Sequence, residues 1–66
     1  MNIGKSTRIA MAKRGIRGNE LAKQLGMSTS AVSILLSRPY SDGKRVAQLA
    51  AFFDMKVSEF IALGED

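Results

Sequence analysis

Apolar residues recur every three or four positions along the chain, in short runs that glycines and the single proline separate. This spacing places the apolar side chains of each run on one face of a helix. No segment alternates apolar and polar residues over the length of a strand, so no sheet is expected. The pattern predicts an all-α fold, a compact bundle of about five short helices in a single domain over residues 1–66. The expected helices span residues 5–14, 19–25, 29–37, 43–53 and 58–63.

The ends of these helices are marked by residues that favour caps and stops. A side chain that accepts a hydrogen bond from a backbone amide favours the start of a helix, and glycine or proline favours its end. The expected caps are Ser6 or Thr7, Asn19, Ser28, Ser41 or Asp42, and Ser58, and the expected stops are Gly15, Gly26 and Pro39. The inward-facing residues form the expected core, which includes Leu21, Ala22, Leu25, Met27, Val32, Leu35, Leu49, Phe53 and Phe60.

The segment 29–37 has an outer face of short hydroxyl side chains, although Ser and Thr are mediocre helix formers. Only Met27 and Ser28 separate it from the stop at Gly26. Two helices joined by a short glycine-containing turn, the second with polar side chains outward, form a helix-turn-helix. The second helix of this motif lies in the major groove of DNA, where hydroxyls bond base edges and an aliphatic group contacts a thymine methyl. The outward residues are Thr29, Ser30, Ser33, Ile34 and Ser37.

The sequence ELAKQLGMSTSAVSILLS, residues 20–37, resembles the helix-turn-helix of the phage repressor and Cro family, also called the xenobiotic-response-element type. With the closing helices included, the likeness covers roughly residues 6–63. It implies the family's five-helix fold and sequence-specific binding of double-stranded DNA. Without a second domain, the chain is more similar to a small Cro-like repressor than to a full-length phage repressor. The matching positions of the motif are Glu20, Leu21, Ala22, Leu25, Gly26, Met27, Ser28, Ser30, Val32 and Ser33.

The resemblance also implies which residues contact DNA. Thr29, Ser30 and Ser33 match positions that read bases, and Ile34 stands where a further base contact is often made. One departure is Gly18, which stands where the family usually has a glutamine that binds phosphate. Cations beside the motif are well placed for phosphate contact. The expected contacts to the DNA backbone are Arg17, Gly18, Asn19, Ser28, Ser37, Arg38, Lys44 and Arg45.

Charge is distributed unevenly along the chain, whose net charge is +4. Residues 1–45 carry nine cations and two anions, a net charge of +7, whereas residues 46–66 carry one cation and four anions. A basic region beside an acidic one indicates a polyanionic partner on one side of the molecule. A solvated surface explains the basic region equally well by itself, so the charge supports DNA binding only together with the motif.

The composition argues against several other function classes. The chain has no histidine and no cysteine, so it lacks the commonest general base, the commonest metal ligand and any disulfide. Its carboxylates are scattered, with no pair at a catalytic spacing. We therefore expect no enzymatic activity and no cofactor, metal or small-molecule ligand. No apolar run approaches the ~20 residues of a membrane span, and no signal peptide is evident, which indicates the cytoplasm of a bacterial host.

A DNA reader of this size buries little surface, which predicts a homodimer, formed in solution or only on DNA, on a pseudopalindromic operator. The expected interface residues are Phe52, Lys56 and Phe60. Phe52 and Phe53 cannot both point inward, so Phe52 is either an edge residue or part of that interface. Tyr40 either contacts DNA or packs over the end of the core. The alternative function is an antitoxin-like or other protein-interaction module, whose main partner is another protein.

Overall fold

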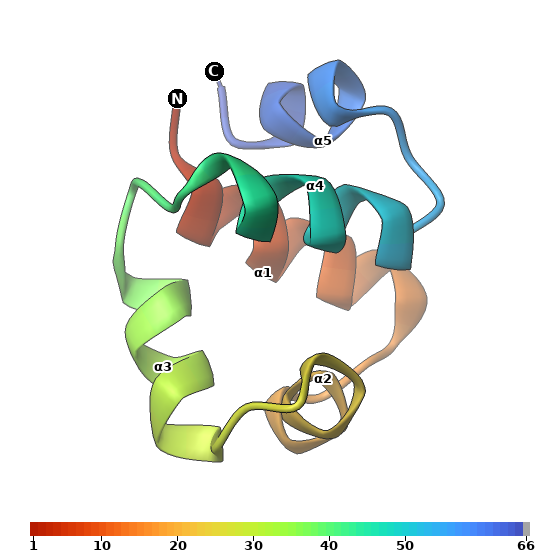
Figure 1. Ribbon diagram of the computed structural model, residues 1–66. Coiled ribbons are helices and arrows are strands. Elements are labelled where there is room, and N and C mark those ends of the chain that lie inside the picture. Colours follow the sequence, from red (N-terminus) through yellow and green to blue (C-terminus); the bar gives the residue numbers. More distant parts are fainter. Residues whose placement is uncertain (66) are drawn as a thin grey trace.

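The computed structural model describes residues 1–65, so Asp66, the last residue of the expected domain, lies outside the described part. Five helices confirm the all-α prediction, and no strand occurs among the described residues (Figure 1). One helix has its predicted bounds, and the other four differ from prediction by one or two residues at a single end. The helices are α1 (Ile3–Arg14), α2 (Gly18–Leu25), α3 (Thr29–Ser37), α4 (Gly43–Phe52) and α5 (Val57–Leu63).

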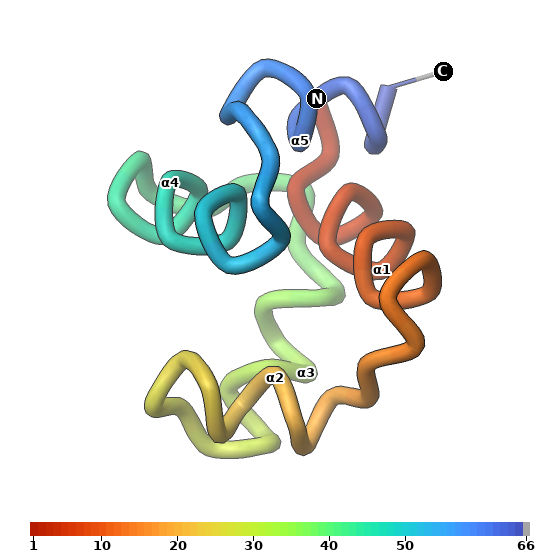
Figure 2. The backbone as a smooth tube through the Cα atoms, turned by 90° about the vertical axis from the view of Figure 1, so that its right-hand side faces the viewer, coloured from red at the N-terminus to blue at the C-terminus, as the bar shows by residue number. Residues whose placement is uncertain are grey.

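Helix α1 packs closely against two of the other four helices. It packs against both α3 and α5, while α2 packs on α3 and α4 packs on α5. Two views at right angles show α2 at one end of the molecule, and α5 with both chain termini at the other (Figure 1, Figure 2). The fold therefore separates the helix-turn-helix pair from the end of the chain.

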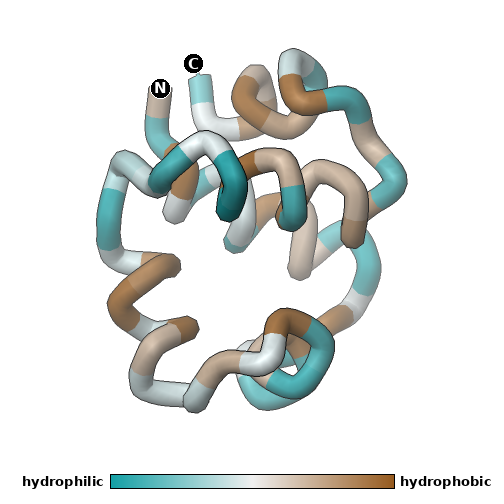
Figure 3. Tube along the Cα trace, viewed as in Figure 1, coloured by the Kyte–Doolittle hydropathy of each residue, from teal (hydrophilic) through white to brown (hydrophobic). Residues whose placement is uncertain are grey.

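The core contains the residues that helical spacing placed inward. Leu21, Leu49 and Phe60 have no exposed surface, and Val32 is nearly as buried. Met27 is half-buried and packs against the edge of this cluster. Figure 3 shows the apolar residues of α2 on the side that faces the other helices. This packing fixes which faces of α2 and α3 remain exposed.

The start of α1 differs from the prediction that Ser6 or Thr7 caps it. The helix begins at Ile3, and the Asn2 side chain accepts a hydrogen bond from the Lys5 amide at 3.0 Å. Ser6 and Thr7 lie inside the helix and are fully buried. Their hydroxyls donate to backbone carbonyls at 3.2 and 2.7 Å, so neither is an unsatisfied polar group. The predicted cap was therefore wrong.

Contacts far along the chain explain the early start of α1. The Ile3 amide donates to the Pro39 carbonyl at 2.7 Å, and the Gly4 amide donates to the Arg38 carbonyl at 2.9 Å. A Cβ atom on Gly4 would lie 2.5 Å from the Leu36 carbonyl oxygen, so only glycine allows this approach. The first amides of a helix have no partner within it. Here the backbone after α3 supplies that partner, which ties the end of α3 to α1.

The remaining caps divide into two confirmed and two wrong predictions. Ser28 caps α3, as predicted, and Asp42 rather than Ser41 caps α4, where its carboxylate accepts from the Arg45 amide at 2.8 Å. Asn19 does not cap α2, which starts one residue earlier, at Gly18. Ser58 does not cap α5, which starts at Val57. Instead, Glu59 reaches back and accepts from the Lys56 amide at 2.9 Å.

Candidate nucleic-acid interface

The turn between α2 and α3 is fixed by its own hydrogen bonds. Gly26 ends α2 with a φ of 66°, a left-handed conformation that glycine adopts without strain. The next amide, of Met27, donates to the Ala22 carbonyl at 2.9 Å. Ser28 then accepts from the Ala31 amide at 3.1 Å and starts α3. Both helices therefore meet at a defined angle, as a helix-turn-helix requires.

One face of α3 is buried and the opposite face is exposed, as the helical spacing predicts. Val32 and Leu35 are buried, whereas all four predicted base-reading residues are exposed, including Ile34 at 51%. No hydrogen bond within residues 1–65 engages the hydroxyls of the three polar ones. This face therefore offers donors, acceptors and one aliphatic group to a partner. The four residues are Thr29, Ser30, Ser33 and Ile34.

The start of α2 supplies backbone donors beside this face. Arg17 occupies the cap position, is exposed and makes no capping hydrogen bond. Within the described chain, no acceptor reaches the amides of Gly18 and Asn19. Unpaired amides and the helix dipole make such an end favourable for an anion such as phosphate. The Asn19 side chain accepts from the Glu20 amide at 2.9 Å, so it forms a hydrogen bond within the first turn of α2 and does not cap the helix.

The cations after α3 differ in their exposure and in their hydrogen-bond partners. Arg38 and Lys44 are exposed, and Lys44 lies in the first turn of α4. Arg45 is half-buried, and its guanidinium donates to the Gln48 side chain at 2.7 Å, which leaves its other N–H groups for a phosphate. The Ser37 hydroxyl donates to the Ile34 carbonyl at 2.8 Å. It therefore approaches a phosphate as a donor only by giving up that bond.

A family model of the Cro/C1-type helix-turn-helix DNA-binding domain matches residues 8–66 of the chain. The match omits residues 1–7, which include the first five residues of α1, and it covers the four later helices. The chain belongs to the Cro/C1-type family. No curated protein and no solved structure matches it. Membership confirms the resemblance seen in residues 20–37 and supports DNA binding with a role in transcription regulation.

Among the described residues, no group of three His, Cys, Asp or Glu side chains is arranged to hold a metal ion. No helix in the described part of the chain is long and apolar enough to cross a membrane.

The expected dimer residues of this Cro/C1-type chain do not share one environment. Phe60 is fully buried and stacks on Phe53 with a centroid distance of 6.2 Å. Its side chain has no surface to offer a second copy, so its assignment to the interface was wrong. Phe52 is half-buried, with its ring edge-to-face on Phe53 at 5.0 Å, and Lys56 is exposed. Phe52 is therefore an edge residue whose outer side stays accessible.

Two further side chains have positions that the sequence left open or did not indicate. Tyr40 is 71% exposed, which argues against the alternative that it packs over the end of the core, and a contact with DNA stays a prediction. Arg14 donates to the Phe53 carbonyl at 2.6 Å and so ties the end of α1 to the end of α4. No local sequence pattern predicts this contact, because its acceptor lies 39 residues away along the chain. Basic residues on α1 thus include one with a structural role.

Proposed function

We propose that this Cro/C1-type protein reads a specific sequence in the major groove of double-stranded DNA and acts as a small Cro-like repressor. The observation that carries the proposal is the outer face of α3. Its hydroxyls and Ile34 are exposed, while the opposite face of the same helix is buried. Short side chains let the helix backbone approach the bases closely. Thr29, Ser30, Ser33 and Ile34 would then select the bases.

Phosphate contacts on both sides of α3 would hold the helix in the groove. The open amides of Gly18 and Asn19, together with Arg17, would bind one stretch of backbone. Arg38 and Lys44 would bind another, with Ser28, Ser37 and Arg45 completing the expected set. Such contacts position a protein without reading sequence, and they make its affinity depend on salt. Base selection would therefore rest on α3 alone.

A homodimer would place two copies of α3 on a pseudopalindromic operator. A single module of this size buries too little surface for tight binding, and half-sites about 34 Å apart double the contacts. Phe52 and Lys56, near the end of α4 and the start of α5, are the surface residues proposed for the contact between copies. The role we propose requires no catalysis and no cofactor.

The test is selection of bound duplexes from a random pool at near-physiological salt. Three proteins are compared: the native chain, Ser33→Arg and Ala62→Arg. The last is a matched control, because it adds the same charge at an exposed position of α5. We expect the native chain and the control to enrich one two-fold symmetric motif, and Ser33→Arg to alter or lose it. Equal retention of all sequences, reversed by modest salt, would leave only a basic surface. The protein-interaction module would then be the better proposal.

A further inference from the structure

The segment between α3 and α4, residues 38–41, is attached to the rest of the fold by α1. The Gly4 amide donates to the Arg38 carbonyl at 2.9 Å, and the Ile3 amide donates to the Pro39 carbonyl at 2.7 Å. Within residues 1–65, no other hydrogen bond joins this segment to a helix other than α3. Two neighbouring amides of α1 therefore fix the path of the chain directly after the proposed base-reading helix.

Gly4 also lets two carbonyl groups at the end of α3 lie directly on the backbone of α1. A Cβ atom added at Gly4 would be 2.5 Å from the Leu36 carbonyl oxygen and 2.6 Å from the Arg38 carbonyl oxygen. Arg38 itself is extended, with φ −102° and ψ 140°. Because the backbone conformation of a residue determines the direction of its Cβ atom, a fixed backbone at Arg38 also fixes the direction in which its side chain starts. The start of α1 therefore sets the origin of the Arg38 side chain.

The first turn of α1 is itself held from another side by the end of α5. The buried Ser6 hydroxyl donates to the Ile61 carbonyl at 3.2 Å. At Gly64, an added Cβ atom would overlap the Asn2 carbonyl oxygen, and it would lie 2.5 Å from the Ser6 hydroxyl oxygen. A residue that positions another needs such support, because a loosely held neighbour cannot keep a side chain in one geometry. The first turn of α1 is therefore a fixed support between the ends of α3 and α5.

Arg38 is a residue for which this support matters. Its side chain is exposed, and no hydrogen bond or ion pair within residues 1–65 engages it. A guanidinium binds phosphate through N–H groups in a rigid planar fork, so the contact depends on how the side chain is aimed. The residues that hold the Arg38 backbone, Ile3 and Gly4, precede residue 8, where the match to the family model begins. Their role is therefore not implied by membership of the family.

We propose that Ile3 and Gly4 are positioning residues for DNA binding, whose backbone holds Arg38 so that its guanidinium meets a phosphate beside the end of α3. The inference rests on the proposed function, in which Arg38 contacts the DNA backbone, and it names what holds that contact in place. Ile3 and Gly4 are buried and do not touch DNA themselves. A purely stabilising role has a different consequence, because a smaller folded fraction weakens binding alike at every salt concentration. Loss of a phosphate contact changes the salt dependence itself.

Ile3→Pro tests the attachment, because proline has no amide hydrogen to donate to the Pro39 carbonyl. Ile3 is the first residue of α1, where proline is favoured, and Asn2 is already extended, as the residue before a proline must be. Ile3→Val is the matched control, since it trims the same buried side chain and keeps the amide.

Binding is measured by fluorescence anisotropy over a range of salt concentrations, on a labelled duplex of mixed sequence, where phosphate contacts act without base reading. The temperature is one at which circular dichroism shows every variant folded. We expect Ile3→Pro to lower the slope of log affinity against log salt by about one unit, and Ile3→Val to leave it unchanged. An unchanged slope for Ile3→Pro overturns the inference.

Arg38→Gln tests whether the effect passes through Arg38. In this background, Ile3→Pro should cause no further fall in the slope, because the contact that it would misplace is already absent. A full additional fall overturns the inference. Gly4→Ala displaces the same carbonyl groups by adding a methyl group, so it should show the same loss and the same coupling. It replaces Ile3→Pro in the measurement if that variant does not fold.

The inference and the proposed function fail in different ways. If Arg38→Gln alone leaves the slope unchanged, Arg38 is not a phosphate contact and the inference is overturned. A symmetric motif in the selection would still leave base reading by α3 standing. If the coupling to Arg38 is found but no motif is enriched, the positioning role stands and the operator proposal is rejected.

Discussion

Helices α1 and α3 carry similar hydroxyl side chains in opposite surroundings. Ser6 and Thr7 of α1 are fully buried, and their hydroxyls donate to backbone carbonyls. Ser30 and Ser33 of α3 are exposed, and no hydrogen bond within residues 1–65 engages their hydroxyls. In α1 these groups stabilise the fold, whereas in α3 they remain available to a partner. The same residue type therefore predicts a function only when its face of the helix is known.

The difference extends beyond the hydroxyls. The inner side of α1 meets α3 and α5, and its first amides hold the backbone that follows α3. Beyond the first turn, changes on that side should alter the free energy of unfolding. They should weaken DNA binding only as far as they lower the fraction of folded protein. Changes on the outer face of α3 should alter DNA binding at constant stability.

Phe60→Ala should have the largest effect, on stability. The side chain is fully buried and stacked on Phe53, so its loss should cost about 3–5 kcal/mol of unfolding free energy. A domain of this size has little more than that in total. We expect no cooperative thermal transition by circular dichroism above room temperature. Phe52→Ala, which truncates a half-buried ring, is the control and should retain one. A native-like melt for Phe60→Ala would mean that this residue is not part of the core.

Gly4→Ala should be the next most damaging change, although it adds only a methyl group. The new Cβ would lie 2.5 and 2.6 Å from the Leu36 and Arg38 carbonyl oxygens, which are backbone atoms that move only with the end of α3. We expect a loss of about 1–3 kcal/mol in chemical denaturation. Gly18→Ala is the matched control, because its Cβ would meet only Val32, at 3.9 Å. Equal stability of the two variants would show that α1 does not hold the backbone after α3.

These positions also show how far the sequence predicts this fold. The bounds of α3 follow from local signals, the Ser28 cap and the stop at Pro39, and both act on neighbouring residues. The start of α1 does not follow, because its first amides bind carbonyls of residues 38 and 39, which only folding brings near. Without those acceptors, Ser6 or Thr7 is the better cap.

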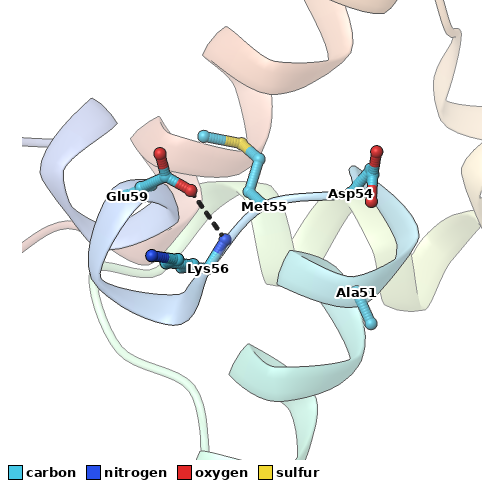
Figure 4. A pocket seen from close by; sticks show the side chains of 5 residues that line it. All are labelled: Ala51, Asp54, Met55, Lys56 and Glu59. Carbon is cyan, nitrogen blue, oxygen red and sulfur yellow. Dashed lines mark hydrogen bonds between the residues drawn. The ribbon is translucent and has the colours of Figure 1, made fainter.

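The candidate site likewise has some features that the sequence predicts and others that it does not. The exposed face of α3 follows from helical spacing, because one stripe of the helix must be buried. The bond between Arg45 and Gln48 depends on the choice of side-chain rotamers, which spacing does not determine. The pocket lined by Ala51, Met55 and Glu59 (Figure 4) requires α4 and α5 to be placed against each other, so no local pattern indicates it. Phe60 was predicted both in the core and at an interface, and burial decides for the core.

Ile34→Ala should change specificity and leave stability unchanged. The side chain is 51% exposed, so its truncation should alter the unfolding free energy by less than about 0.5 kcal/mol. If Ile34 contacts a thymine methyl, the variant should lose about 1 kcal/mol of preference for thymine at one position of each half-site. Fluorescence anisotropy with duplexes that carry thymine or uracil at that position measures the preference directly. An unchanged preference at every position would remove Ile34 from the base-reading set.

Lys44→Gln should have the smallest effect, visible chiefly in the salt dependence of binding. Lys44 is exposed in the first turn of α4, where a phosphate contact would release about one counterion per copy. The slope of log affinity against log salt should therefore fall by about one unit on a single half-site, with the base preferences unchanged. Lys13→Gln removes the same charge from the exposed end of α1 and should leave the slope unchanged. If both variants lower the slope equally, the basic half of the chain acts as a diffuse charge. In that case, α4 would not bind the DNA backbone at a defined phosphate, and the contrast between α1 and α3 would concern base reading alone.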